Sequence, residues 1–117
     1  MARVVIIGAS IGGLPAAYEC RKALGKAHQV TVISNVDFFH FVPSNPWVAV
    51  GWRDRAAVTI PIAPHLARKG IGFIGKPVTA IDPAANRLTL DGGEALDYDY
   101  LVITTGPRLS FDEVPGA

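Results

Sequence analysis

An apolar run that ends in glycines, at the start of the chain, constrains the fold more than any other feature. Residues 3–7 read Arg-Val-Val-Ile-Ile and are followed by Gly-Ala-Ser-Ile-Gly-Gly and an Ala-rich segment. A short continuous apolar run predicts a strand buried on both faces. The Ala-rich segment predicts a helix over residues 12–24 that ends at Gly25. Strand, glycine turn and helix in this order predict the opening of a dinucleotide-binding βαβ unit.

Each small residue of the glycine turn has a role in such a unit. Gly8 forms the tight turn, the position of Ser10 lets the backbone approach a pyrophosphate, and Gly13 lets the helix pack on the strand. The pyrophosphate then lies on free N–H groups at the positive end of the helix. Ser10 departs from the pattern, because glycine is usual there; its Cβ narrows the approach, while its hydroxyl adds a donor. The alternative is a strand–turn–helix with a purely structural role.

The second predicted strand covers residues 29–33, which are rich in β-branched side chains. It closes a βαβ unit of about 30 residues, the length that this motif requires. In units that bind NAD, an acidic residue near the end of this strand binds the ribose hydroxyls. Ser34, Asn35 and Asp37 are the candidates here. The alternative is that these three residues only turn the chain.

Residues 38–47 contain four aromatic side chains and two prolines. The prolines disfavour a long helix and a central strand. Two interpretations remain open for the segment: a wall for a flat apolar ligand, or a hydrophobic plug under a loop. After it, the sequence predicts a helical turn over 47–51, an exposed polar turn over 52–55 and a helix over 61–69.

The rest of the chain predicts how the sheet is completed. A strand over 71–74 follows the second helix, so the order of elements indicates a parallel sheet with right-handed crossovers. Residues 77–82, 87–90 and 94–97 are separated by Asp-Pro and Asp-Gly-Gly turns and predict a small antiparallel β-meander. Residues 100–107 return to the parallel sheet and end beside the glycine turn. The predicted fold class is α/β, a Rossmann-like parallel sheet with a meander.

Composition bounds the remaining possibilities. A chain of 117 residues that is 50% hydrophobic and 18% charged has the size and apolar content of one packed domain. A net charge of +1 gives no indication of a nucleic-acid partner. We expect no signal peptide and no membrane span, since no apolar run approaches ~18 residues. Cys20 is the single cysteine, and neither His40 nor His65 has a partner at metal-ligand spacing. We therefore assign no metal ligand and no catalytic residue.

The order of these motifs resembles flavoproteins with two dinucleotide-binding domains, of the glutathione-reductase type. Three blocks narrow the resemblance to the sulfide:quinone oxidoreductase family: residues 12–19, the Phe-Val-Pro-Ser-Asn-Pro-Trp block at 41–47 followed by Val-Gly-Trp at 50–52, and residues 106–116. The block at 41–47 is far more specific than the glycine turn. The resemblance covers essentially the whole chain.

This resemblance implies that residues 1–117 are the N-terminal part of an FAD-binding domain in a longer flavoenzyme that oxidises sulfide and reduces quinone. In the family the glycine turn binds the FAD pyrophosphate and the end of the second strand binds the ribose. The Val-Pro-Ser-Asn segment approaches the flavin, and the start of the meander contacts the adenine end. The corresponding cofactor-binding residues are Gly8, Ala9, Ser10, Gly12, Gly13, Ser34, Asn35, Pro43, Val78, Thr105 and Gly106.

The resemblance also implies what these residues do not carry alone. The family's redox cysteines and second nucleotide-binding domain lie beyond a segment like this one, and Cys20 matches none of those cysteines. We therefore expect the 117 residues to be inactive by themselves, and to lose FAD because the walls of its site are incomplete. We expect self-association through uncovered apolar surface. The side chains expected on that surface are Phe38, Phe39, Phe41, Trp47 and Trp52.

The resemblance leaves location and two alternative functions to be tested. It implies a parent protein that is peripheral on the cytoplasmic membrane of a prokaryote, whereas the 117-residue stretch is expected to be soluble. One alternative is a stand-alone dinucleotide-binding module without catalysis. The other is a fragment of an enzyme similar to type II NADH dehydrogenases.

Overall fold

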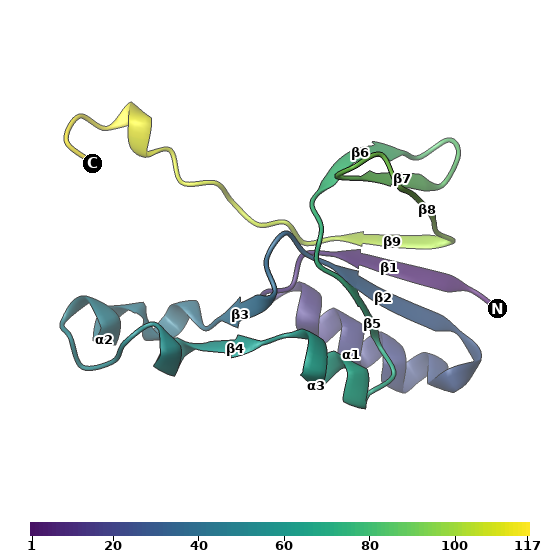
Figure 1. The fold of residues 1–117 in the computed structure, drawn as a ribbon, viewed down its shortest axis with the longest axis horizontal. Helices are drawn as coiled ribbons and strands as arrows, with labels where there is room; N and C mark the ends of the chain where they lie inside the picture. The colour runs from purple at the N-terminus through teal and green to yellow at the C-terminus, as the bar shows by residue number, and fades with distance from the viewer.

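A parallel sheet forms the centre of the molecule (Figure 1). The computed structural model describes residues 1–117. The sheet has the strand order β5-β2-β1-β9, and all three pairings are parallel, which confirms the predicted fold class. Its strands are β1 (Arg3–Ile7), β2 (Gln29–Ile33), β5 (Gly72–Ile74) and β9 (Tyr100–Ile103). The last strand along the chain therefore lies beside the first, as the sequence predicted.

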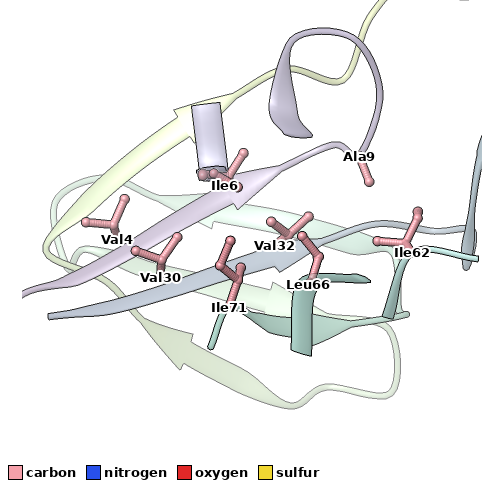
Figure 2. Packing of buried hydrophobic residues seen from close by; sticks show 9 residues of the cluster. Val4, Ile6, Ala9, Val30, Val32, Ile62, Leu66 and Ile71 are labelled. Atoms are coloured by element: carbon pink, nitrogen blue, oxygen red, sulfur yellow. The ribbon is translucent and has the colours of Figure 1, made fainter. Parts of the chain in front are cut away.

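One face of this sheet is covered by helices α1 (Gly13–Leu24) and α3 (Ala63–Arg68). Val4 and Ile6 of β1 point to this face and pack in one buried cluster with Ala17 and Leu66 (Figure 2). Alternate residues of a strand point to opposite faces, so the other side chains of β1 point to the opposite face of the sheet. The helix α1 ends where predicted, because Gly25 follows it with a φ of 62°.

The other face is covered by the predicted antiparallel meander. Its strands are β6 (Val78–Asp82), β7 (Arg87–Leu90) and β8 (Ala95–Asp97). Leu88 and Leu90 of β7 pack in a second buried cluster with Val5 and Ile7 of β1. The strand β1 is thus buried on both faces, as its uninterrupted apolar sequence predicted.

Between β2 and α3 the chain forms an arm that the sequence did not predict in this form. Its core is a two-stranded antiparallel ribbon of β3 (Phe38–His40) and β4 (Thr59–Pro61). The turns η2 (Val42–Ser44) and η3 (Ala56–Val58) and the short helix α2 (Asn45–Ala49) lie between these strands. Prolines are tolerated here because the ribbon lies outside the central sheet and Pro61 ends its strand.

The two helix predictions near the arm need correction. The turn expected at 47–51 begins earlier, at Asn45, because Pro46 suits the first turn of a helix. The helix expected at 61–69 begins at Ala63, with Pro64 in its first turn, since Pro61 belongs to β4.

The expected set of exposed aromatic side chains is correct for three members and wrong for two. Phe41, Trp47 and Trp52 are 48%, 41% and 77% exposed. Phe38 and Phe39 are half-buried. The guanidinium of Arg55 lies 5.1 Å from the ring centroid of Phe38, and Phe39 packs against the helix-face cluster. These two side chains therefore belong to the folded body rather than to its uncovered surface.

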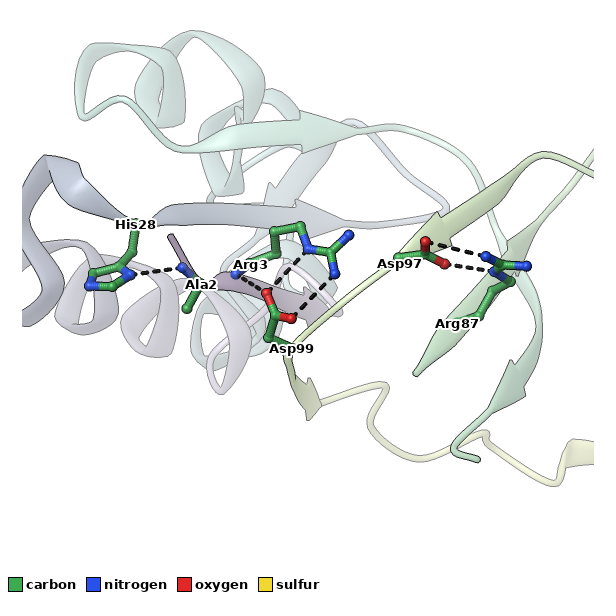
Figure 3. Close-up of polar contacts among 6 residues, drawn as sticks. All are labelled: Ala2, Arg3, His28, Arg87, Asp97 and Asp99. Carbon is green, nitrogen blue, oxygen red and sulfur yellow. Dashed lines mark hydrogen bonds and ion pairs between the residues drawn. The ribbon is translucent and has the colours of Figure 1, made fainter. Parts of the chain in front are cut away.

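Polar contacts tie the ends of the elements together (Figure 3). The backbone N–H of Ala2 donates to Nδ1 of His28 over 2.9 Å, and the carboxylate of Asp99 accepts three hydrogen bonds from Arg3. The segment after β9 includes the turn η4 (Phe111–Glu113) and extends away from the body. None of the helices has the length and apolar character that a membrane crossing requires.

Candidate functional site

A cleft of about 650 Å³ opens at the carboxyl ends of the parallel strands. Its walls come from the residues that follow β1, β2 and β9, from β6 of the meander and from β3 of the arm. Ligands of open α/β sheets bind at this edge, and ligand sites commonly have volumes of about 300–1,000 Å³. The place and size of the cleft therefore favour a dinucleotide-sized ligand.

The glycine turn after β1 can be formed only by residues without a Cβ at two positions. Gly8 has a φ of +104°, and its N–H donates to the carbonyl of Ile33 over 2.8 Å. A Cβ on Gly8 would overlap the carbonyl of Thr104, and a Cβ on Gly13 would overlap the carbonyl of Gly8. A Cβ on Gly12 would lie 3.4 Å from Cβ of Thr104, an ordinary contact. The predicted tight turn and close helix packing are therefore present.

The turn presents a row of unused hydrogen-bond donors. The backbone N–H groups of residues 9–13 donate no hydrogen bond within the chain. No side chain caps the start of α1, which is 12 residues long. Unpaired N–H groups at the positive end of a helix attract anions. Ser10 is exposed and lines the cleft beside them, so this wall of the cleft also carries a side-chain hydroxyl.

The three ribose candidates after β2 differ in whether they line the cleft. Ser34 is buried, its N–H donates to the carbonyl of Ile74, and its Oγ accepts the N–H of Val36. Asn35 is exposed, and both Ser34 and Asn35 line the cleft. Asp37 does not line it; its carbonyl accepts the N–H of Ile62. The end of β2 therefore offers a hydroxyl and an amide, but no carboxylate.

The remaining predicted site residues are divided between the lining and its surroundings. Val78 and Thr105 line the cleft. Pro43 and Gly106 are exposed and lie outside the lining, although Val42 belongs to it. Gly12, which precedes α1, and Gly13, its first residue, also lie outside the lining. The structure thus brings seven of the predicted residues to one cleft: Gly8, Ala9, Ser10, Ser34, Asn35, Val78 and Thr105.

Thr104 is a lining residue that sequence reasoning passed over. Its Oγ1 donates to the carbonyl of Ile7 over 2.8 Å and lies 3.3 Å from the carbonyl of Gly8. Its backbone N–H also donates to the carbonyl of Ile7, over 2.8 Å. The Thr-Thr-Gly sequence at the end of the returning strand includes Thr104, but the family resemblance indicated only Thr105 and Gly106.

The charge of the lining suits an anionic ligand. Lys76 is the one lysine or arginine among the lining residues, and no aspartate or glutamate lines the cleft. The Nζ of Lys76 lies 2.7 Å from Oε2 of Glu94, which raises the pKa of Lys76 and lowers that of Glu94. Both side chains are more than half exposed, so this ion pair contributes little to stability and leaves the ammonium accessible to a ligand.

The strand β3 separates the cleft from a second hollow. Phe38 and His40 line the cleft, whereas Phe39 lines an apolar groove of about 400 Å³ together with side chains of α1 and α3. The Nε2 of His40 lies 2.7 Å from Oδ1 of Asn45, which holds the ring against the start of α2. Phe38 therefore provides part of the apolar wall that the aromatic segment suggested.

Comparison with known proteins agrees with this geometry. A family model described as pyridine nucleotide-disulphide oxidoreductase matches residues 2–117. The chain is 42% identical to a sulfide-quinone reductase of Aquifex aeolicus over 92% of its own length and 25% of that relative's length. It is 32% identical to an NADH dehydrogenase-like protein of Mycobacterium tuberculosis over 99% of its own length and 29% of that relative's length.

A solved structure agrees with the sequence comparison. The crystal structure of the sulfide:quinone oxidoreductase from Aquifex aeolicus superposes with a TM-score of 0.90 and 41% sequence identity, covering 95% of this chain and 26% of that one. The resemblance to sulfide:quinone oxidoreductases is therefore confirmed. The chain spans about a quarter of the length of the curated relatives it matches.

Proposed function

The chain belongs to the pyridine nucleotide-disulphide oxidoreductase family, and from that premise we propose that residues 1–117 form the N-terminal part of an FAD-binding domain. The whole polypeptide is then a flavoenzyme that oxidises sulfide and reduces a quinone. The observation that carries this proposal is the 42% identity to a sulfide-quinone reductase across 92% of the chain. FAD, when bound, supplies the two-electron redox chemistry between donor and quinone.

The residues of the cleft fit the FAD that this proposal requires. A dinucleotide needs a backbone cradle for its pyrophosphate, and a Cβ on Gly8 or Gly13 would clash with the backbone that forms this turn. The unpaired N–H groups of residues 9–13 supply donors. We assign Gly8, Ala9, Ser10, Gly12 and Gly13 to the pyrophosphate, and the ribose to Ser34 and Asn35.

The other proposed contacts follow the walls of the cleft. We assign the adenine end to Val78 and the flavin side to Pro43, Thr105 and Gly106. Val78 and Thr105 line the cleft, and Val42 lines it beside Pro43. The residues of this chain bind and orient the cofactor, while Lys76 adds positive charge to a lining without carboxylates. No residue among the 117 is assigned to proton or electron transfer.

A binding and activity experiment tests the proposal. We expect the purified chain to be colourless and to bind added FAD weakly and reversibly, because the cleft is open. We expect no sulfide-dependent quinone reduction by the 117 residues, since thiol–disulfide chemistry needs two cysteines and the chain has Cys20 alone. The longer polypeptide should retain yellow FAD and reduce quinone with sulfide. Sulfide-dependent turnover by the 117 residues, or failure of FAD to bind the longer polypeptide, would contradict the proposal.

An NADH-oxidising parent is the second candidate function. The 32% identity to an NADH dehydrogenase-like protein favours it over functions outside the family, but the identity to the sulfide-quinone reductase is higher. Measuring quinone reduction with sulfide and with NADH as donors separates the two. A chain that binds FAD tightly without a longer polypeptide would instead support a stand-alone dinucleotide-binding module.

Location and assembly complete the proposal. We place the parent protein peripherally on the cytoplasmic membrane of a prokaryote. A quinone acceptor supports the membrane location. The chain is more similar to the bacterial relative than to two mitochondrial sulfide:quinone oxidoreductases, which are 27% and 22% identical to it, and this supports a prokaryotic parent. The exposed apolar side chains of the arm support self-association of the 117 residues.

A further inference from the structure

The carbonyl oxygen of Gly8 lies inside the turn that presents its N–H groups to the cleft. This oxygen has one donor in the chain, the hydroxyl of Thr104, at 3.3 Å. The single proton of this hydroxyl is shared with the carbonyl of Ile7, which lies closer, at 2.8 Å. An anion that binds N–H groups is repelled by nearby carbonyl oxygens with free lone pairs. A donor that is directed at the carbonyl oxygen of Gly8 therefore favours anion binding without touching the anion.

Thr104 also determines the shape of the turn. Its Oγ1 would lie 2.7 Å from a Cβ on Gly8 and 2.7 Å from a Cβ on Gly13. Its backbone N–H donates to the carbonyl of Ile7, so backbone and side chain of one residue both bind the end of β1. The threonine is thus packed against both glycines that cannot be replaced, although it follows Gly8 by 96 positions in the chain.

We infer that Thr104 is the positioning residue of the pyrophosphate turn: its hydroxyl holds the carbonyls of Ile7 and Gly8 and so directs the N–H groups of residues 9–13 to a diphosphate ligand. This inference rests on the proposed dinucleotide function of the cleft. It assigns to Thr104 a role in diphosphate recognition that Thr105 and Gly106 do not share, because neither donates a hydrogen bond to the turn.

Substitutions at Thr104 separate the hydroxyl from the packing. Thr104→Val keeps the shape of the side chain and removes the donor, whereas Thr104→Ser keeps the donor. The matched control is Thr59→Val, because Oγ1 of Thr59 donates to the carbonyl of Arg55 over 2.9 Å, outside the cleft. If Thr104→Val does not fold, Thr104→Ala and Thr104→Ser form a second pair, which differs by the hydroxyl alone.

Affinity for ADP and for adenosine, measured by NMR titration of the 117-residue chain, provides the first readout. We expect Thr104→Val to weaken ADP binding about threefold to tenfold, the loss of one hydrogen bond's net contribution, and to leave adenosine binding unchanged. Thr104→Ser and Thr59→Val should bind ADP like the unsubstituted chain. Equal losses for ADP and adenosine, or no loss for either, would overturn the inference, since a purely structural role does not change their ratio.

Amide hydrogen exchange without ligand provides the second readout. The N–H of Gly8 donates to the carbonyl of Ile33 at the end of β2, and the N–H of Leu14 donates to the carbonyl of Ser10 in the turn. Thr104→Val should accelerate exchange at both amides, and Thr59→Val at neither. If the unsubstituted chain binds no ADP, the same titration of the longer polypeptide tests the proposed dinucleotide function, which fails if that polypeptide binds no ADP either. The exchange rates still decide whether Thr104 holds the turn. Unchanged exchange at Gly8 and Leu14 would overturn the inference by itself.

Discussion

Asp99 accepts three hydrogen bonds from Arg3, a residue 96 positions earlier in the chain. The backbone N–H of Arg3 donates to Oδ2 over 2.6 Å, and Nε and Nη2 donate to Oδ2 and Oδ1 over 3.2 Å each. In return, the N–H of Asp99 donates to the carbonyl of Arg3 over 2.9 Å. These contacts join the start of β9 to the start of β1, and the resulting register places Thr104 beside Gly8 at the other end.

The Arg3–Asp99 contact predicts a loss of stability in acid. The hydrogen bonds from the side chain and then the backbone of Arg3 hold the pKa of Asp99 below its ordinary value of 3.8. A carboxyl whose folded pKa is depressed stabilises the fold above its unfolded pKa, and this contribution disappears as the pH falls through the folded pKa. The stability of the chain should therefore decrease as the pH falls below 3.8.

Urea unfolding at pH 7 and at several values below pH 4 checks this prediction. Asp99→Asn keeps an acceptor for the N–H of Arg3 but removes the charge, so it should lower stability at pH 7 and flatten the acid dependence. Asp112→Asn is the matched control, because Asp112 lies in the exposed segment after β9 and makes no ion pair. An acid dependence that Asp99→Asn leaves unaltered would show that this contact does not produce it.

Alanine substitution at two adjacent glycines should have different effects on the free energy of unfolding. Gly13→Ala places a Cβ on the carbonyl of Gly8, and overpacking of this kind costs typically about 1–3 kcal/mol or more. Gly12 has a helical φ of −83° and ψ of −48° and room for a Cβ, so Gly12→Ala should be neutral or stabilise by about 0.4–1 kcal/mol. Thermal and urea unfolding of both variants measure the difference, and equal destabilisation would refute the close packing of α1 on the turn.

Arg21 should matter for stability but not for ligand binding. Its guanidinium donates to the carbonyls of Gly25, His28 and Gly70 over 2.6, 2.9 and 2.8 Å, and so joins the end of α1 to the end of α3. We expect Arg21→Met to cost about 1–3 kcal/mol of unfolding free energy in urea. Arg21→Lys should recover only part of this lost stability, because a lysine cannot reach the three carbonyls at once.

The control for Arg21 is an arginine without such contacts. Arg68 is exposed and makes no hydrogen bond through its side chain, so Arg68→Met should change stability by less than about 0.5 kcal/mol. ADP affinity should be unaltered in both variants, since neither side chain lines the cleft. A loss of ADP affinity in Arg21→Met would mean that the two ends of α1 are coupled.

The parts of the fold that the sequence predicted are those determined by local pattern. The strands β1 and β9 are almost entirely apolar, β2 is rich in β-branched side chains, and Gly25 ends α1 by its own conformation. The ribbon of β3 and β4 escaped prediction because it pairs Phe38 with Pro61, a contact that no local pattern specifies. Two prolines near α3 also left its start ambiguous, since each is compatible with a first helical turn.

The residues of the candidate site that could be predicted are likewise those indicated by local sequence. The glycine turn was predicted from consecutive residues, and Ser34 and Asn35 from the end of a strand. Thr104 was missed because its role depends on the register between β1 and β9, which Arg3 and Asp99 help to fix. Lys76 was missed because an isolated lysine between two predicted strands has no distinguishing sequence signal; its position at the cleft follows from how the meander packs over the sheet.

The arm should drive self-association of the 117 residues. Val50 and Trp52 are 61% and 77% exposed, and soluble monomers rarely leave a contiguous apolar patch of more than a few hundred Å² in water. We expect sedimentation at increasing concentration to detect dimers or larger species, and Val50→Ser with Trp52→Ser to reduce them. Leu109→Ser with Phe111→Ser is the matched control, because these side chains are similarly exposed but lie in the segment after β9. A strictly monomeric profile of the unsubstituted chain would contradict the prediction, and a reduction by the control alone would assign the association to that segment instead of the arm.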